Sequence, residues 1–191
     1  MFAAASDGSQ ASLAALAGFA SPGVEIAIVE AEPPPPVPGT TIMSRAAVTQ
    51  MILEALTPGE PPSFEIVPLG EDDAPQMLAL AIATRPGPFF SRTHQLGDFV
   101  GVKDGGRLVA MAGERMKPTG FTEVSGVCTW PEYRGRGYAG GLMRVVTARI
   151  LARGETAFLH AYASNTGAIG LYESLGFAVR RELTMTVLAG G

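Results

Sequence analysis

The sequence predicts an α+β fold, and three observations support this prediction. From residue 64 onward, strand-like and helix-like segments follow one another in the order β-α-β-β-β-α-β-α-β. Clusters of proline and glycine mark the ends of these segments. The chain has 191 residues, of which 47% are hydrophobic and 17% charged, so it can bury a core of ordinary size. We therefore expect one main domain over residues 63–191.

Residues 1–62 are predicted to form an appendage that contains strands and ends in a proline-rich connector. Small polar residues at 1–11 are expected to fray. A run of prolines cannot form a helix or lie inside a sheet, so it is expected to be a stiff link. The expected elements are a brief helix capped by Ser12, strands at 24–29 and 48–53, and a polyproline segment at 33–38.

The main domain is expected to consist of alternating strands and helices with clear boundaries. Acidic residues and a proline at 71–75 mark a helix start, and Lys103-Asp-Gly-Gly106 has the composition of a hairpin turn. The expected strands lie at 64–67, 99–102, 107–115, 121–129, 156–163 and 179–188. The expected helices run from Glu71 to Thr84, from Ala139 to Ile150, and from a cap at Asn165 to Leu175.

A glycine-rich turn joins the strand at 121–129 to the helix that follows it. Arginine and glycine alternate over residues 134–137, and glycine allows successive backbone N–H groups to face one point. The next residues begin a helical pattern, so this turn is a helix N-terminus with unpaired N–H groups and the positive end of the helix dipole. The sequence therefore predicts an anion site whose spacing suits a pyrophosphate.

Residues 134–139 (Arg-Gly-Arg-Gly-Tyr-Ala), after a strand that ends in Val-Cys-Thr-x-Pro, resemble the acetyl-coenzyme A motif of the GNAT superfamily of N-acetyltransferases. Residues 165–177 (Asn-x-x-Ala-x-x-x-Tyr-Glu-x-x-Gly-Phe) resemble the second motif of that superfamily. The resemblance covers about residues 64–188. Within the superfamily, this domain is similar to the branch that includes glycine N-acyltransferase-like proteins. It implies an α/β/α sandwich, with helices on both sides of a mixed, largely antiparallel central sheet whose strands splay apart.

The same resemblance implies which residues meet acetyl-CoA. Tyr172 is expected to reach the sulfur and to protonate the leaving thiolate, although its position on the apolar helix face also fits a core tyrosine. The residues expected to bind the cofactor are Val127, Cys128, Thr129, Arg134, Gly135, Arg136, Gly137, Tyr138, Ala139, Asn165, Ala168 and Tyr172.

The residue that takes the proton of the amine is harder to identify. Glu123 matches a position where some GNAT enzymes carry a catalytic glutamate, and a partly apolar setting is expected to raise its pKa. On an alternating strand, Glu123 would share a face with Ser125, Val127 and Thr129. Glu114 and His160 are the alternatives. Cys128 is expected to behave as a small buried apolar residue and not as a nucleophile, because no histidine and aspartate surround it in the sequence to activate its thiol.

The expected activity is transfer of an acetyl group from acetyl-CoA to a primary amine of a small molecule, amino acid or peptide, by direct attack. The alternative is a GNAT-fold module that binds acetyl-CoA as a sensor or scaffold without turnover. In the first reading Tyr172 is the general acid, and a pure binding module would not need a tyrosine beside the sulfur. A primary amine is therefore the expected partner.

Composition argues against other classes of partner. The formal net charge is −4, so no global basic field favours nucleic acid or an anionic membrane. A single cysteine excludes a disulfide framework and a cysteine-rich zinc site, and no metal is expected. The N-terminal apolar stretch lacks a basic flank and is broken at 21–23, so a cytoplasmic protein is expected. A homodimer is compatible with a domain that ends in a strand.

Overall fold

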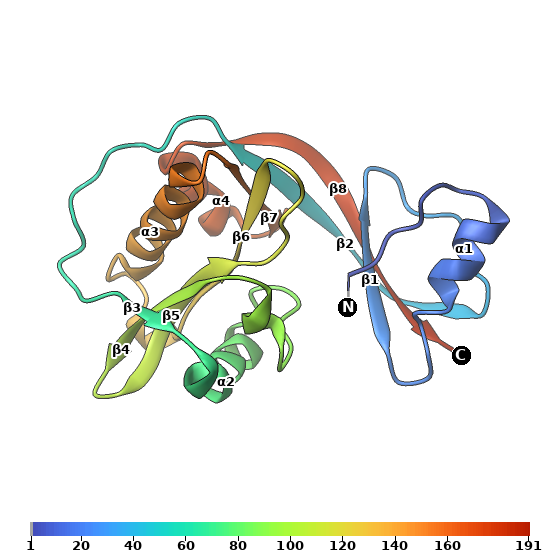
Figure 1. The fold of residues 1–191 in the computed structure, drawn as a ribbon, viewed down its shortest axis with the longest axis horizontal. Helices are drawn as coiled ribbons and strands as arrows, with labels where there is room; N and C mark the ends of the chain where they lie inside the picture. Colours follow the sequence, from blue (N-terminus) through green and yellow to red (C-terminus); the bar gives the residue numbers. More distant parts are fainter. Residues whose placement is uncertain (1) are drawn as a thin grey trace. The chain divides into compact units, whose positions relative to one another are not determined.

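The computed structural model describes residues 2–191 and contains the predicted order of elements from the first strand of the main domain onward (Figure 1). The strands are β1 (Glu25–Glu30), β2 (Thr40–Leu53), β3 (Val67–Leu69), β4 (Phe99–Asp104), β5 (Arg107–Glu114), β6 (Phe121–Thr129), β7 (Thr156–Tyr162) and β8 (Phe177–Gly190). The α-helices are α1 (Gln10–Ala17), α2 (Ala74–Thr84), α3 (Tyr138–Ala152) and α4 (Thr166–Ser174). Short 3-10 helices lie at η1 (Glu71–Asp73), η2 (Thr93–Leu96) and η3 (Pro131–Tyr133).

The described chain divides into two compact units. The first unit comprises the chain up to Gln50 together with Ala161–Thr166 and Val179–Gly191. The second unit comprises Met51–His160 and Gly167–Ala178. Strands β2, β7 and β8 have residues in both units, so neither unit is continuous in sequence. The division at residue 62 remains a prediction about domains.

In the first unit, β1 pairs antiparallel with β8. The expected fraying of the first residues is wrong over 2–11, because Phe2 bridges to Ala27 and α1 already begins at Gln10. The expected helix cap is also wrong: the side chain of Ser9 accepts a hydrogen bond from the backbone N–H of Ser12. The core of this unit gathers Leu13, Leu16, Ala20, Ile26, Ile28, Val37 and Leu188.

In the second unit, the strand order is β7-β6-β5-β4-β3. Only β6 and β7 are parallel among these pairs, and α2 and α3 lie on opposite sides of β4–β6 (Figure 1). The predicted α+β class, with helices on both sides of a mixed and largely antiparallel sheet, is confirmed. No helix in the described part of the chain has the length and apolar character needed to cross a membrane.

The first strand of the second unit lies further along the chain than predicted. Strand β3 begins at Val67, whereas Phe64 lies outside it and packs its ring edge-on against Tyr138 at 4.8 Å. Pro68 cannot donate to a strand ladder, which is tolerated because β3 is an edge strand. Packing on α3 thus removes Phe64 from the sheet. Periodicity alone does not reveal this contact.

Strand β6 separates from β7 well before it ends. The two strands pair in parallel only over Phe121–Glu123, while β6 continues to Thr129. On its other side, β6 pairs with β5, but the register shifts between the pairs Met111↔Cys128 and Gly113↔Ser125. Between these two pairs β6 advances by three residues and β5 by only two, so β6 contains a bulge. The expected sharing of one face from Glu123 to Thr129 is therefore wrong beyond the bulge.

Candidate functional site

The glycine turn predicted from sequence connects β6 to α3. Gly135 and Gly137 have φ angles of 75° and 76°, in the left-handed region that side chains disfavour. No atom within 4 Å would obstruct a Cβ at either glycine, so the backbone conformation is what requires glycine there. Gly137 caps α3 without a side-chain hydrogen bond, which leaves N–H groups of the first turn available to a ligand.

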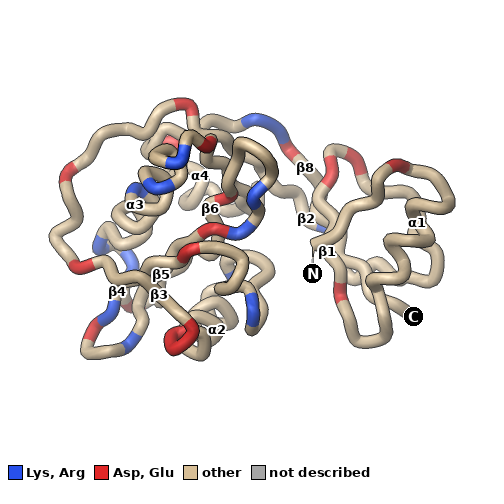
Figure 2. The backbone as a smooth tube through the Cα atoms, in the orientation of Figure 1, with Lys and Arg blue, Asp and Glu red and all other residues tan. Residues whose placement is uncertain are grey.

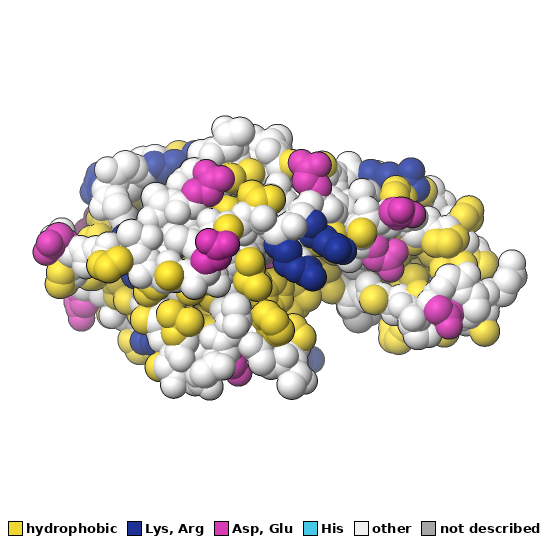
Figure 3. Space-filling view, turned by 90° about the horizontal axis from the view of Figure 1, so that it is seen from above, with side chains coloured by type: hydrophobic (Ala, Val, Ile, Leu, Met, Phe, Trp, Pro, Cys, Tyr) yellow, Lys and Arg dark blue, Asp and Glu magenta, His cyan; other side chains and the backbone are white. Residues whose placement is uncertain are grey.

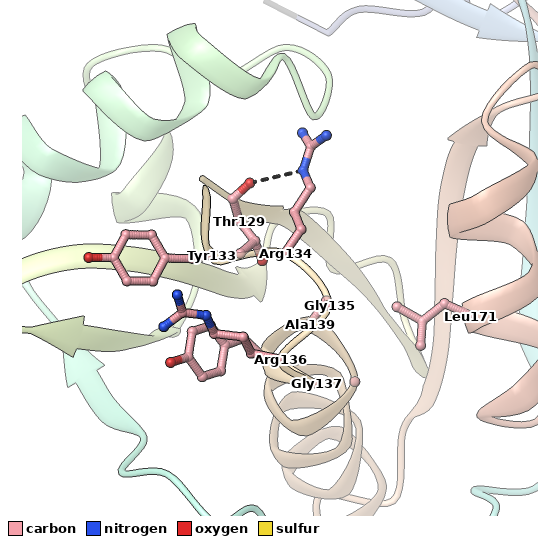
Figure 4. Close-up of a pocket in the computed structure, with 10 residues that line it drawn as sticks. Thr129, Tyr133, Arg134, Gly135, Arg136, Gly137, Ala139 and Leu171 are labelled. Carbon is pink, nitrogen blue, oxygen red and sulfur yellow. Dashed lines mark hydrogen bonds between the residues drawn. The ribbon is translucent and has the colours of Figure 1, made fainter. Parts of the chain in front are cut away.

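A pocket of about 220 Å³ lies at this turn (Figure 4). It brings together seven of the residues predicted to bind the cofactor: Thr129, Arg134, Gly135, Arg136, Gly137, Tyr138 and Ala139. It also has Tyr133, Gly140 and Leu171 in its lining, which sequence reasoning missed. Leu171 precedes Tyr172 on the apolar side of α4, so the helical pattern was the one available signal for it.

The two arginines of the turn point in different directions (Figure 4). Arg134 donates from Nε to the backbone oxygen of Thr129 at 3.4 Å. The guanidinium of Arg136 lies 4.7 Å from the ring centroid of Tyr133 and donates to the backbone oxygen of Glu132. Both arginines are exposed, and in this structure only the side chain of Arg134 lies against β6.

The end of β6 has polar groups that suit an elongated ligand. Residues 125–127 are only half-buried, at the bulge where β6 has already separated from β7. Gly126 has a φ of 64° at this point. The hydroxyl of Thr129 is buried and has no hydrogen-bond partner among the described residues. These residues therefore fit the arm of the predicted cofactor.

Cys128 and Tyr172 are both buried and both keep their protons at neutral pH. Burial raises the pKa of the Cys128 thiol to about 12, and Cys128 packs with Met77 and Leu80 of α2. The prediction that Cys128 is a small buried apolar residue is confirmed. Burial, together with the nearby Cys128, raises the pKa of the Tyr172 phenol to about 12. Tyr172 is therefore a proton donor and not a phenolate.

Glu123 is buried at the last residue pair between β6 and β7. Arg115 donates from Nε and Nη2 to its two carboxylate oxygens at 2.9 and 3.0 Å, and Nδ1 of His160 lies 2.9 Å from Oε1. Burial disfavours the charged carboxylate, but hydrogen bonds from His160 and Arg115 outweigh burial and hold the pKa of Glu123 below its usual value. The expected raised pKa is therefore wrong.

Glu114 is the second buried carboxylate at this end of the sheet. Its oxygens lie 2.8 Å from Nζ of Lys117 and 3.0 Å from Nη2 of Arg153. Glu123 and His160 thus form one cluster, and Glu114 belongs to a different one. Within the described residues, no group of three or more histidine, cysteine, aspartate or glutamate side chains is arranged to hold a metal.

The other five predicted cofactor residues, including Cys128 and Tyr172, lie outside the pocket lining. Val127 is half-buried at the bulge, and Ala168 is half-buried in α4. Asn165 lies in the segment Ala161–Thr166 of the first unit, where its backbone N–H donates to the backbone oxygen of Tyr162 at 2.8 Å. The roles of all five toward a cofactor remain predictions.

Charges of both signs are spread along the backbone of each unit (Figure 2). The face displayed in Figure 3 likewise has acidic, basic and apolar side chains interspersed. This distribution agrees with the modest net charge of −4.

Comparison with known proteins identifies relatives of this chain. A family model described as FR47-like protein matches residues 99–186. A crystal structure titled as a putative acetyltransferase from the GNAT family, from Novosphingobium aromaticivorans, is 52% identical with a TM-score of 0.86, covering 100% of this chain and 84% of that chain.

One further relative and one structure of the same fold are named N-acetyltransferases. The N-alpha-acetyltransferase RimI of Mycobacterium tuberculosis is 36% identical over 83 residues, or 41% of this chain and 51% of that protein. The present chain thus spans about half the length of that curated relative. The ribosomal-protein-S18-alanine N-acetyltransferase of Escherichia coli is 22% identical with a TM-score of 0.54, over 66% of this chain and 92% of that chain, and so shares the fold.

The buried carboxylate gives the first testable prediction. Glu123→Gln should lower the free energy of unfolding by about 3 kcal/mol at pH 7, because the buried guanidinium of Arg115 loses its paired carboxylate. The pKa of Glu123 in the folded protein lies below the ordinary 4.5. Its contribution is therefore present above pH 4.5 and is lost as pH falls through the lower folded value. Urea unfolding of wild type and Glu123→Gln at several pH values measures the difference in their free energies of unfolding.

The exposed Glu65 offers a control for this variant. Glu65→Gln should change the free energy of unfolding by less than about 0.5 kcal/mol at every pH. A difference between wild type and Glu123→Gln that stays constant from neutral to acid pH would contradict the assignment of the ionised carboxylate to Glu123.

Proposed function

The chain belongs to the GNAT superfamily of N-acetyltransferases, and on that premise we propose that it transfers the acetyl group of acetyl-CoA to a primary amine. The acceptor class is a small molecule, an amino acid or a peptide N-terminus. The observation that carries the proposal is the pocket at the start of α3, which adjoins the open end of β6. The names of the relatives favour a peptide amine among these acceptors.

The residues at the pocket suit the two polar parts of acetyl-CoA. The pyrophosphate would lie at residues 134–139, where backbone N–H groups, the helix dipole and Arg134 favour negative charge. The pantetheine arm would run along residues 127–129, whose backbone has no β7 partner and where the Thr129 hydroxyl is unpaired. Bound acetyl-CoA supplies the activated acetyl group as a thioester.

Two groups of the chain would move protons in this reaction. Tyr172 holds its proton through neutral pH and is proposed to donate it to the departing thiolate. Glu123 is a weak base because Arg115 and His160 stabilise its charged form. We therefore assign the amine proton to His160, with Glu123 as the positioning residue that fixes the imidazole through Nδ1.

A binding and turnover experiment tests the function as a whole. Acetyl-CoA is titrated into the full chain by calorimetry, and thiol release is then followed over free amino acids, small amines and peptides with free N-termini. Saturable binding with turnover on one class supports the proposal. Binding without turnover on any amine would instead favour a sensor or scaffold, and the absence of binding would refute the assignment of the pocket.

Arg134 tests the anion site. Arg134→Gln should weaken acetyl-CoA binding about tenfold, because a guanidinium beside the pyrophosphate is lost. The loss should shrink as salt concentration rises, since salt screens exposed charges. Arg149→Gln, an exposed change in the last turn of α3, is the matched control and should bind as wild type does. Equal binding by both variants would place the pyrophosphate elsewhere.

Tyr172 tests the general acid. Tyr172→Phe should lower kcat by about 10²–10⁴-fold, because no proton is delivered to the thiolate. Binding of acetyl-CoA, measured by calorimetry on the same preparation, should stay within about twofold, because the phenyl ring remains in the buried site. A variant with wild-type kcat would assign the proton to another group.

The split between kcat and KM tests the His160 assignment. His160→Gln should reduce kcat at pH 8 by about 10²-fold, because no group takes the proton of the amine, and should leave the KM for acetyl-CoA unchanged. Glu123→Gln should also lower kcat, because Nδ1 of His160 loses the carboxylate that fixes the ring. If neither change alters kcat, the cluster is structural only.

A further inference from the structure

The first unit has a pocket of its own, lined entirely by residues of that unit. Its volume is about 160 Å³, well below the roughly 300–1,000 Å³ of pockets for drug-sized ligands, so it suits a small molecule. The lining consists of Pro34, Pro35, Pro36, Val37, Thr40, Ile42, Arg45, Thr186 and Leu188. Nothing in the acetyl-transfer proposal uses any of these residues.

One residue of the pocket lining has a buried hydroxyl without a hydrogen-bond partner. Thr186 of β8 is completely buried, and its Oγ1 has no hydrogen-bond partner among the described residues. In the strand register it lies opposite Ile28, and Leu188 two positions along lies opposite Ile26, so the same sheet face is otherwise apolar. A buried hydroxyl without a partner is costly, and such groups call for a ligand or a water.

The walls of the pocket are apolar and held in place. Three consecutive prolines form one wall, and proline side chains lose little freedom when a ligand binds. The end of this wall is fixed because Thr40 donates from both its backbone N–H and its hydroxyl to the backbone oxygen of Val37, at 3.3 and 2.9 Å. The apolar surface is therefore largely preformed.

Arg45 supplies the only charge in the lining. It lies on an exposed part of β2, and no carboxylate of the described residues forms an ion pair with it. A cationic ligand is disfavoured beside this guanidinium. A purely apolar ligand would leave the Thr186 hydroxyl unpaired. The Thr40 hydroxyl already donates to Val37. The guanidinium of Arg45 can only donate hydrogen bonds and the hydroxyl of Thr186 can donate one, so both suit an anionic acceptor.

We propose that this pocket binds a small organic carboxylate with a short apolar chain. The carboxylate oxygens accept hydrogen bonds from the guanidinium of Arg45 and the hydroxyl of Thr186. The apolar chain lies between the proline wall and Leu188. The first unit would then contribute a ligand site to the enzyme, independent of the acetyl-CoA site.

Calorimetric titration of the full chain with butyrate and hexanoate tests the proposal, with the alcohols of the same chain lengths as uncharged probes. Both carboxylates should bind saturably, hexanoate more tightly, and the alcohols should bind at least about tenfold more weakly. Arg45→Gln should weaken hexanoate binding about tenfold and Thr186→Val about fivefold. Acetyl-CoA binding, measured alongside, should be unchanged in both variants.

Thr184→Val is the matched control, because Thr184 lies on the same strand and outside the pocket lining. It should bind hexanoate as wild type does. Equal binding of alcohol and carboxylate, or equal binding by Arg45→Gln and wild type, would overturn the carboxylate assignment. If neither butyrate nor hexanoate binds to the wild-type chain, the proposal fails.

Discussion

The separation of β6 from β7 after Glu123 is the constraint on which the proposed active site depends. Parallel pairing stops after three residues, although β6 runs on to Thr129. The later backbone of β6 is therefore open on the side that faces away from β5. Because the glycine turn and α3 follow directly, one strand sets both the open edge and the helix N-terminus. These are the two features on which the proposed binding of acetyl-CoA rests.

Side chains replace backbone pairing at the point of separation. Glu123 of β6 bonds to His160 of β7 and, through two hydrogen bonds, to Arg115 just after β5. Burying these charges gains little net stability, because desolvation consumes most of the attraction. Apolar side chains would hold the strands equally well. Under the proposed function, the hydrogen-bonded carboxylate and imidazole at this place serve proton transfer, with Glu123 fixing the ring of His160.

Local features of the sequence predicted the glycine turn at the start of α3, whereas features that depend on long-range contacts could not be predicted. The turn at Gly135 and Gly137 could be predicted because glycine, strand end and helix start are all local signals. The hydrogen-bond partners of Glu123 could not be predicted, because His160 is 37 residues away and the sequence does not give the register between the two strands. Ser9 and Ser12 are equally good caps by residue type, so residue type alone could not identify Ser9 as the cap. Phe64 was misplaced for the same reason, since its partner Tyr138 lies on a distant helix.

The bulge in β6 explains how one strand serves both the core and the pocket. In a regular strand Glu123 and Thr129 would point to the same face, and Cys128 to the other. The extra residue between Ser125 and Cys128 reverses the alternation, so that Cys128 enters the α2 core and Thr129 lines the pocket beside α3. Gly126, with its positive φ, permits this reversal, and its Cβ would lie only 3.0 Å from Phe99. A side chain there would oppose the backbone geometry that places Thr129 in the lining of the pocket.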